Sequence, residues 1–327
     1  MSTGRDTTNY FGSALDLRKV LSTSPPPLAH VLPGLLEATV GMVAATGGTG
    51  KTTFFLQLGM AAALGGPLCG GLFDDVSPDC ARPTEPGRVV FVAAEESANL
   101  MAHRLHAAAA DAFSSDYPLL DLTERMAMLD LLAANLRVFP MLGKPRTLLI
   151  DEEHEPTEAF LQLEEACKGA SLVLLDPIRQ FHRGDENDSW NMTAVVQTLQ
   201  RLASRTGAAV LLAHHTNRAS TNMGTAETAG AARGSTALTD GVRWQLNLSR
   251  PGRAFCDAYG LRAGEESGYV RADISKANYL APCRPVLLQR MHGGALRLVR
   301  PLVAARGMYK PTAAKRGPAR AKSVQAS

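Results

Sequence analysis

The sequence predicts an α/β fold in which a mostly parallel, twisted sheet is flanked by helices and continues into antiparallel strands at one edge. Three observations support this prediction. A glycine-rich turn at residues 46–50 joins an apolar run to an apolar helix, the pattern of a strand, a phosphate-binding loop and a helix. Further apolar runs of strand length alternate with helical segments, and the stretch from residue 242 to residue 299 alternates apolar and polar side chains.

Each element follows from a local pattern. Residues 13–21 predict a short helix, and the prolines at 25–27 keep the residues after it extended. Continuous apolar runs predict buried parallel strands, and the apolar-periodic segments between them predict helices. The predicted strands are 40–45, 88–94, 136–139, 146–150, 171–175 and 208–213, the predicted helices are 51–64, 99–112, 119–134, 157–168 and 189–206, and the predicted antiparallel strands are 242–249, 269–279, 285–291 and 295–299, with a hairpin turn at 292–294.

Composition limits the class of protein. With 45% hydrophobic and 20% charged residues, the 327-residue chain has the balance of an ordinary globular protein. A net charge of +3 gives no basic field over the whole surface, so any contact with nucleic acid must come from local patches. The five cysteines are scattered and odd in number, and no apolar leader or membrane-length run is present. We therefore expect a cytoplasmic protein with unpaired thiols and no membrane contact.

Three regions are expected along the chain. Residues 1–29 form an N-terminal arm, made of the short helix and the proline-rich segment, which is either a linker or an arm laid on a neighbour. Residues 30–305 form the nucleotide-binding domain. Residues 306–327 contain six basic residues and no acid, which is typical of a disordered tail that is solvated or adds weak, salt-sensitive affinity for DNA.

The glycine-rich turn carries the first functional signal. Its glycines have no side chains, so backbone N–H groups can surround an anion, and Lys51 can reach the outer phosphates of a nucleotide. The hydroxyl of Thr52 can take one position on Mg²⁺. The usual first glycine of the motif is replaced by Ala45, so the entry to the turn can differ in shape. The predicted nucleotide-binding residues are Gly47, Gly48, Thr49, Gly50, Lys51, Thr52 and Thr53.

Hydrolysis of a nucleoside triphosphate also needs carboxylates, for Mg²⁺ and for activation of water. Two predicted strand ends compete for the metal: Asp176 after LVLL, and the pair 151–152 after TLLI. The pair 95–96 follows a third strand and suits the water-activating base. Acidic pairs at helix N-termini are also common without any catalytic role, because the helix dipole favours them there.

Two histidines, His214 and His215, end another predicted strand beside a Ser/Thr/Gly/Ala-rich loop. One of them could hydrogen-bond the γ-phosphate and report its loss to the loop. No cysteine or aspartate cluster accompanies them, so a zinc site is not expected.

Several blocks occur in one order: GGTGKT, VAAEES with AHRLHA, LVLLDPIRQFH with DEN, LLAHHTN, ARGSTALTDGVRWQ, ISKANYLAP and MHGGALRL. In this order they resemble the RepA replicative helicases of broad-host-range IncQ-type plasmids, which belong to the RecA/DnaB-like ring ATPases. The resemblance covers roughly residues 14–300. It implies a RecA-like P-loop core, a homohexameric ring, ATP with Mg²⁺, and ATP-driven unwinding of DNA in plasmid replication.

The resemblance also implies roles for single residues. Asp176 matches the metal-supporting aspartate of the family, Glu95 the catalytic glutamate and His215 the sensor histidine. Arg243 matches an arginine that reaches the ATP of the neighbouring subunit. Lys276 resembles a basic residue on the corresponding strand and is a second candidate for that contact. Arg104 lies in a shared block without an assigned role.

Two loops are expected to hold single-stranded DNA by phosphate contacts without reading bases. The first contains Arg179 and Arg183, and the second contains Arg218 and Arg233. Plasmid initiator and primase proteins are further possible partners implied by the family. Two other functions stay open: a P-loop kinase of small molecules, for which no arginine-bearing lid is visible, and a RecA-like regulatory or loading ATPase that does not unwind DNA.

Overall fold

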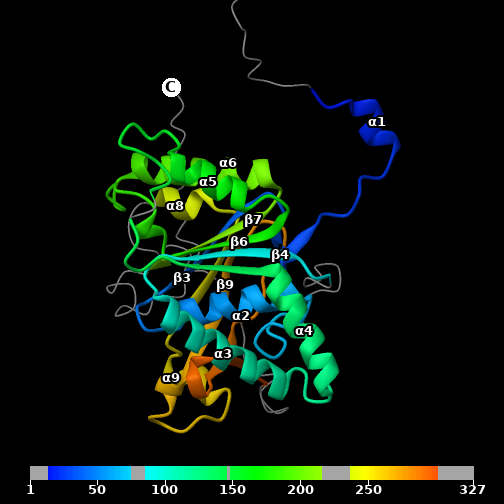
Figure 1. Cartoon of the computed structure of the whole chain (residues 1–327), viewed down its shortest axis with the longest axis vertical. Helices are drawn as coiled ribbons and strands as arrows, with labels where there is room; N and C mark the ends of the chain where they lie inside the picture. Colours follow the sequence, from blue (N-terminus) through cyan, green and yellow to red (C-terminus); the bar gives the residue numbers. More distant parts are fainter. Residues whose placement is uncertain (1–13, 75–84, 146–147, 216–235, 301–327) are drawn as a thin grey trace, which may run out of the picture.

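The computed structural model describes residues 14–74, 85–145, 148–215 and 236–300. These residues form a twisted nine-stranded sheet with helices on both faces, and a separate two-stranded hairpin (Figure 1). The strands of the sheet, in spatial order, are β11 (Leu296–Val299), β10 (Val286–Arg290), β9 (Tyr269–Ala277), β8 (Trp244–Ser249), β3 (Val40–Ala45), β7 (Ala209–His215), β6 (Ala170–Asp176), β4 (Arg88–Ala93) and β5 (Leu136–Pro140), and the hairpin pairs β1 (His30–Leu32) with β2 (Leu35–Leu36).

The strands from β8 through β3, β7, β6 and β4 to β5 run parallel, and β9, β10 and β11 add antiparallel pairs at one edge. The predicted α/β architecture with an antiparallel edge is therefore confirmed. The orientation of β8 differs from the expectation, since this strand is antiparallel only to β9. The chain reaches β8 from β7 through α8 (Thr236–Gly241), and such a crossover brings a strand back in the same direction.

Each face of the sheet has its own apolar core. One face is covered by α2 (Lys51–Leu64), α3 (Ala98–Ser115) and α4 (Leu122–Asn135), and the other by α5 (Glu158–Ala166), α6 (Ser189–Thr206) and α8 (Figure 1). The helix that follows the glycine-rich turn, α2, is buried over most of its length, and its Phe54 and Phe55 are fully buried. Burial of such side chains contributes roughly 1.5–3 kcal/mol each, so the position of α2 against the sheet is strongly fixed.

One predicted strand is wrong. The apolar run 146–150, whose first two residues lie outside the described chain, adds no strand to the nine-stranded sheet. Ile150 makes only an isolated bridge to Pro156, and the Leu149 N–H donates to the carbonyl of Phe181. The place beside β4 is taken by β5, so the run instead buries Leu149 and Ile150 in the core under α5 and α6.

The N-terminal helix α1 (Leu17–Ser22) stands away from the body of the molecule (Figure 1). None of its residues is buried, and Leu17 and Leu21 are 65% and 84% exposed. An amphipathic helix that leaves its leucines in water is normally covered by something else. Among the described residues, no helix is both long enough and apolar enough to cross a membrane.

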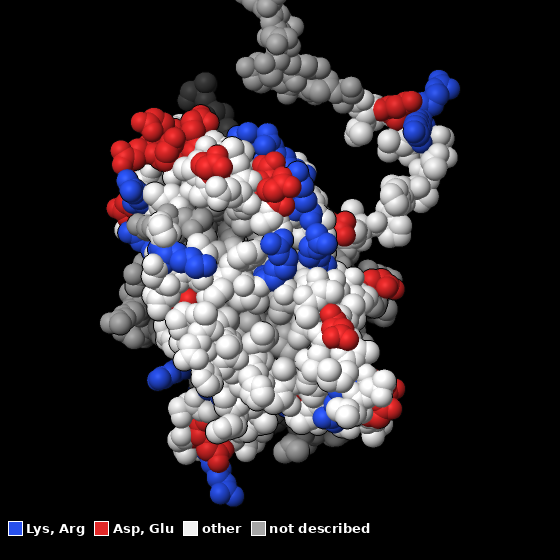
Figure 2. Space-filling model, viewed as in Figure 1, with Lys and Arg blue, Asp and Glu red and all other residues white. Residues whose placement is uncertain are grey.

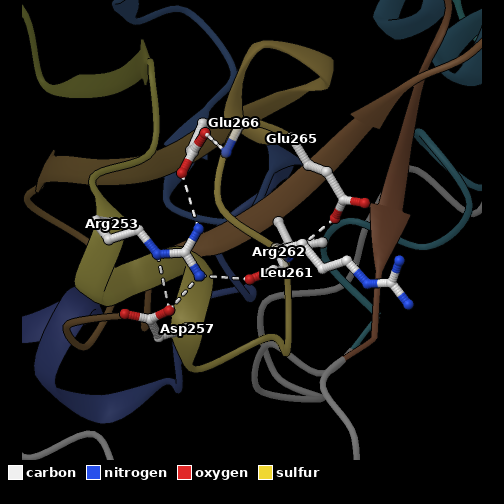
Figure 3. A network of polar contacts seen from close by, with 7 residues as sticks. Arg253, Asp257, Leu261, Arg262, Glu265 and Glu266 are labelled. Carbon is white, nitrogen blue, oxygen red and sulfur yellow. Dashed lines mark hydrogen bonds and ion pairs between the residues drawn. The ribbon is translucent and has the colours of Figure 1, made fainter.

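The connection from β8 to β9 is held by a network centred on Arg253 (Figure 3). This residue begins the short helix α9 (Arg253–Asp257). Its guanidinium donates to Asp257 at 2.8 Å, to Glu266 at 2.9 Å and to the carbonyl of Leu261. The network orders a polar loop that leaves the sheet at the carboxyl end of β8, on the same edge as the glycine-rich turn.

Gln57 joins α2 to the antiparallel edge. Its buried amide donates to the carbonyl of Leu296 at 2.9 Å and accepts from the N–H of Leu296 at 2.8 Å. We predict that Gln57→Ala lowers the free energy of unfolding by about 2–4 kcal/mol, because two buried backbone groups lose their partner. Urea unfolding measures the loss. Gln162→Ala, on the exposed face of α5, serves as the control and is expected to stay within about 0.5 kcal/mol.

Candidate nucleotide-binding site

Strand register brings the predicted site residues to one edge of the sheet. On adjacent strands, Ala45 pairs with His215, and Ala93 pairs with Asp176. The glycine-rich turn follows Ala45, and Glu95 follows β4 after one further residue. The carboxyl ends of β3, β7, β6 and β4 therefore point their polar groups at a common region, where ligands bind in open α/β sheets.

The turn at 46–50 has the geometry of an anion cradle. Gly48 and Gly50 have φ values of 75° and 103°, a region that favours glycine. A Cβ added at Gly47 or Gly48 would meet no described atom within 4 Å, so one side of the turn is open. The N-terminus of α2 has no side-chain cap, which leaves its N–H groups available to an anion. Ala45 ends β3 fully buried, without a positive φ, so this position does not require glycine.

Two short contacts place Lys51 and Thr52. The Lys51 ammonium lies 3.2 Å from Nδ1 of His215, and the Thr52 hydroxyl donates to Oδ2 of Asp176 at 2.6 Å. The hydroxyl and carboxylate oxygens suit Mg²⁺, which prefers hard oxygen ligands. No group of three or more His, Cys, Asp or Glu side chains in the described chain forms a complete metal cage. A pair of protein oxygens supplemented by phosphate oxygens and water is the usual arrangement for Mg²⁺.

Burial makes both charges of the site costly. Desolvation raises the pKa of Asp176, although the hydrogen bond from Thr52 and the charge of Lys51 oppose the rise. Desolvation also lowers the pKa of Lys51, while Asp176 and Glu95 oppose that change. Glu95 and Glu96 add negative charge near Asp176, so the site favours a divalent cation beside the carboxylates and an anion beside Lys51.

The two glutamates after β4 take different partners. Glu95 accepts a hydrogen bond of 2.8 Å from the amide of Gln180, in the 3₁₀ turn η1 (Ile178–Gln180). Glu96 pairs with Arg104 of α3 at 3.0 Å. Gln180 was missed by the sequence reasoning, although it lies in the block that contains Asp176. Arg104, which had no assigned role, holds Glu96 and leaves Glu95 next to the turn.

The competing carboxylates at 151–152 do not follow a strand of the sheet. The Asp151 carboxylate accepts the N–H of Glu155 at 2.8 Å and so closes a local turn. Glu152 pairs with Arg183 at 3.3 Å. Of the two candidates for the metal, Asp176 is the one that contacts the helix after the glycine-rich turn, through the hydroxyl of Thr52.

Arg243 and Lys276 lie near the opposite ends of the parallel strands, where β3 begins. Arg243 is exposed, immediately before β8, and its N–H donates to the carbonyl of Val40 at the beginning of β3. The Lys276 ammonium donates to the carbonyls of Thr239 and Asp240 at 2.8 and 3.2 Å, and burial lowers its pKa. At ~3.3 Å per residue, the length of β3 places the backbone of Arg243 about 20 Å from its own turn, and the backbone of Lys276, level with Met42, about 13 Å from it along the strand direction. The fold does not bring them to the nucleotide site of their own chain.

The predicted DNA-binding arginines have local partners where they are described. Arg179 lies 3.9 Å from Glu186, and Arg183 pairs with Glu152. Arg218 and Arg233 lie outside the described residues, as does the basic tail. In Figure 2, acidic and basic side chains are mixed over the upper part of the drawn face instead of forming one basic patch.

A second residue missed by the sequence reasoning is Arg290, at the end of β10. Its guanidinium donates to the carbonyls of Gly48 and Thr49 at 3.1 and 2.8 Å. The sequence separation of 241 residues gives no local signal for this contact.

Comparisons with known proteins agree with this architecture. A family model described as AAA domain (AAA_25) matches residues 11–221, more than half of the chain. A solved structure described as an ATPase domain superposes with a TM-score of 0.54 at 14% identity, covering 86% of this chain and 96% of that one. A DnaB-like replicative helicase, described with its interactions with primase, superposes with a TM-score of 0.53 at 13% identity, covering 86% of this chain and 64% of the helicase. At these identities the two structures establish the shared RecA-like fold.

The raised pKa of Asp176 generates a prediction about stability. Because that shift already includes the attraction of Lys51, the Asp176 anion is unfavourable on balance in the nucleotide-free protein. We predict that Asp176→Asn, which keeps an acceptor for Thr52, raises the free energy of unfolding at pH 7 by about 1 kcal/mol. The corresponding rise in Tm is roughly 2–4 °C.

The expected effect of Asp176→Asn on stability depends on pH. A folded pKa above the unfolded value means that stability falls as pH rises through the window between the two values. The advantage of the Asn variant is therefore small near pH 4 and grows as pH rises from there toward neutral. Thermal unfolding at both pH values measures it, and a variant less stable than the wild type at pH 7 contradicts the account.

Proposed function

The chain belongs to the AAA domain family, and from this premise we propose that it is an ATP-dependent DNA helicase that works as a homohexameric ring. The observation that carries the proposal is the convergence of Lys51, Thr52, Asp176, Glu95 and His215 at one edge of the sheet. Its counterpart is Arg243, which lies near the opposite ends of the parallel strands, away from its own turn.

The proposed mechanism assigns one task to each residue. Backbone N–H groups of the turn and the Lys51 ammonium hold the phosphates of ATP. Thr52 and Asp176 would hold Mg²⁺, and the bound ion would neutralise charge that develops on the phosphoryl group. Glu95 accepts the proton of the attacking water, and His215 hydrogen-bonds the γ-phosphate.

Gln180 gives the proposed base a link to the turn η1. Its hydrogen bond to Glu95 spans the carboxyl ends of neighbouring strands β4 and β6. Movement of η1 would therefore change the position of the carboxylate that activates water. This link supports a coupling between hydrolysis and the loop that begins at η1.

Assembly into a ring follows from the position of Arg243. Arginine suits the transition state because its planar guanidinium can pair with two phosphate oxygens. Because the backbone of Arg243 lies about 20 Å from its own turn, we propose that it serves the site of another copy. Lys276 is proposed as a second basic residue at the same interface. The exposed leucines of α1 support an assembly in which the N-terminal arm is laid on a neighbour.

We propose that DNA binds at the loop that follows β6 and at the stretch 217–233, which lies outside the described residues. Arg179 and Arg183 must leave Glu186 and Glu152 before they can contact phosphates, so we expect weak, salt-sensitive binding at this loop. Arg218 and Arg233 are the candidate residues of the second stretch. A primase is a candidate partner by analogy with the DnaB-like helicase described with primase. Plasmid replication, with an initiator protein as a further partner, is the proposed setting.

A strand-displacement assay on a forked duplex tests the activity. We predict ATP-dependent displacement and faster hydrolysis with single-stranded DNA, and that Lys51→Ala abolishes both. ATP hydrolysis that DNA stimulates without displacement would favour a regulatory or loading ATPase. Phosphoryl transfer to a small-molecule acceptor would instead favour a kinase.

Mixed rings test the shared site. Lys51→Ala and Arg243→Ala are each expected to lose hydrolysis, the latter by about 10³–10⁵-fold if Arg243 acts as such a residue does elsewhere. A mixture of the two should regain activity, because some interfaces combine an intact turn with an intact arginine. The control mixture, Lys51→Ala with Glu95→Ala, should not recover, because both residues belong to the same half of the site. No recovery in the first mixture at any ratio contradicts the role of Arg243.

A further inference from the structure

Arg290 contacts the outer side of the glycine-rich turn. It ends β10 and pairs with Leu296 of β11, so its backbone is held by the antiparallel edge of the sheet. The guanidinium donates to the carbonyls of Gly48 at 3.1 Å and Thr49 at 2.8 Å. A Cβ added at Gly50 would lie 3.3 Å from the guanidinium, so the side chain also packs against this glycine.

These contacts fix the orientation of two peptide units. In a trans peptide the C=O and the following N–H point in opposite directions. The carbonyls of Gly48 and Thr49 point toward Arg290, so the N–H groups of Thr49 and Gly50 point away from it. The N–H of Thr49 donates to the carbonyl of Thr46 at 3.3 Å. The N–H of Gly50 is the group that an anion cradle can use here. The turn has open space beside it, since a Cβ added at Gly48 would meet no described atom within 4 Å.

The partners of Arg290 are neutral, which is unusual for a partly buried cation. Among the described residues its hydrogen bonds go to the two loop carbonyls, and no carboxylate is paired with it. Burial and the neighbouring charge of Arg250 lower the pKa of Arg290, but an arginine remains charged at neutral pH. The guanidinium therefore loses part of its hydration beside the turn, and no carboxylate among the described residues compensates for that loss.

We propose that Arg290 is a positioning residue for the phosphates of the nucleotide. By holding the outward carbonyls of Gly48 and Thr49, it fixes the shape of the turn and orients the N–H of Gly50 toward the β-phosphate. This inference rests on the proposed function and adds to it a residue from the antiparallel edge. It acts within one chain, in contrast to Arg243.

Binding of fluorescent ADP, with AMP as competitor, tests the proposal on the full chain. Arg290→Ala should weaken the binding of ADP by about 10-fold or more, because two hydrogen bonds from a charged donor to the turn are lost. The affinity for AMP, which lacks the β-phosphate, should change by less than about twofold. So small a difference does not indicate a lost hydrogen bond. Arg290→Lys should recover part of the affinity, because its ammonium can still reach a carbonyl. Arg284→Ala, an exposed arginine just before the same strand, is the matched control and should leave both affinities unchanged.

The outcomes separate the possible causes. Equal loss of ADP and AMP affinity, or of the cooperative unfolding transition, would mean that Arg290 only supports the fold and would overturn the proposal. An equal loss in Arg250→Ala, which keeps the hydrogen bonds, would assign the effect to charge alone and would also overturn it. Unchanged ADP binding in Arg290→Ala, with binding by the wild type, overturns this inference but leaves the proposed function intact. No ADP binding by the wild type contradicts both.

Discussion

Register between parallel strands is the constraint on which the site depends. Ala45 pairs with His215 and Ala93 pairs with Asp176, so a shift of one residue in either pairing would separate the groups that now meet. The strands can keep this register because they are buried on both faces by two continuous apolar cores. Rigid strands thus hold the ends of irregular loops, and the loops carry the chemistry.

The charges of the candidate site reduce the stability of the folded protein. Asp176 and Lys51 are both desolvated, and the pKa of each shifts in the direction that disfavours its charge. The Lys51 ammonium lies against Nδ1 of His215, and the Asp176 carboxylate accepts from the Thr52 hydroxyl. In the proposed function, an anion and a cation would take over these contacts. Functional sites commonly sacrifice stability in this way. The same logic applies to Arg290, whose charge lies beside neutral carbonyls.

Much of this architecture is predictable from the sequence, because burial and turn chemistry are local. The strand ends at Asp176 and His215 follow from apolar runs that stop at polar residues. The run 146–150 is misassigned because periodicity cannot distinguish a buried strand from an apolar segment that covers a core. Gln180 and Arg290 could not be found, because each depends on which distant strands lie side by side. The remoteness of Arg243 from its own turn likewise depends on the direction of β8, which the alternating pattern does not reveal.

The central claim is that one chain carries only half of the hydrolytic site. The most direct measurement is ATP turnover per chain as a function of protein concentration, with sedimentation recording assembly in the same samples. The account predicts almost no turnover where the chain is monomeric and a steep rise where rings form. Constant turnover per chain down to concentrations at which only monomer sediments would contradict it.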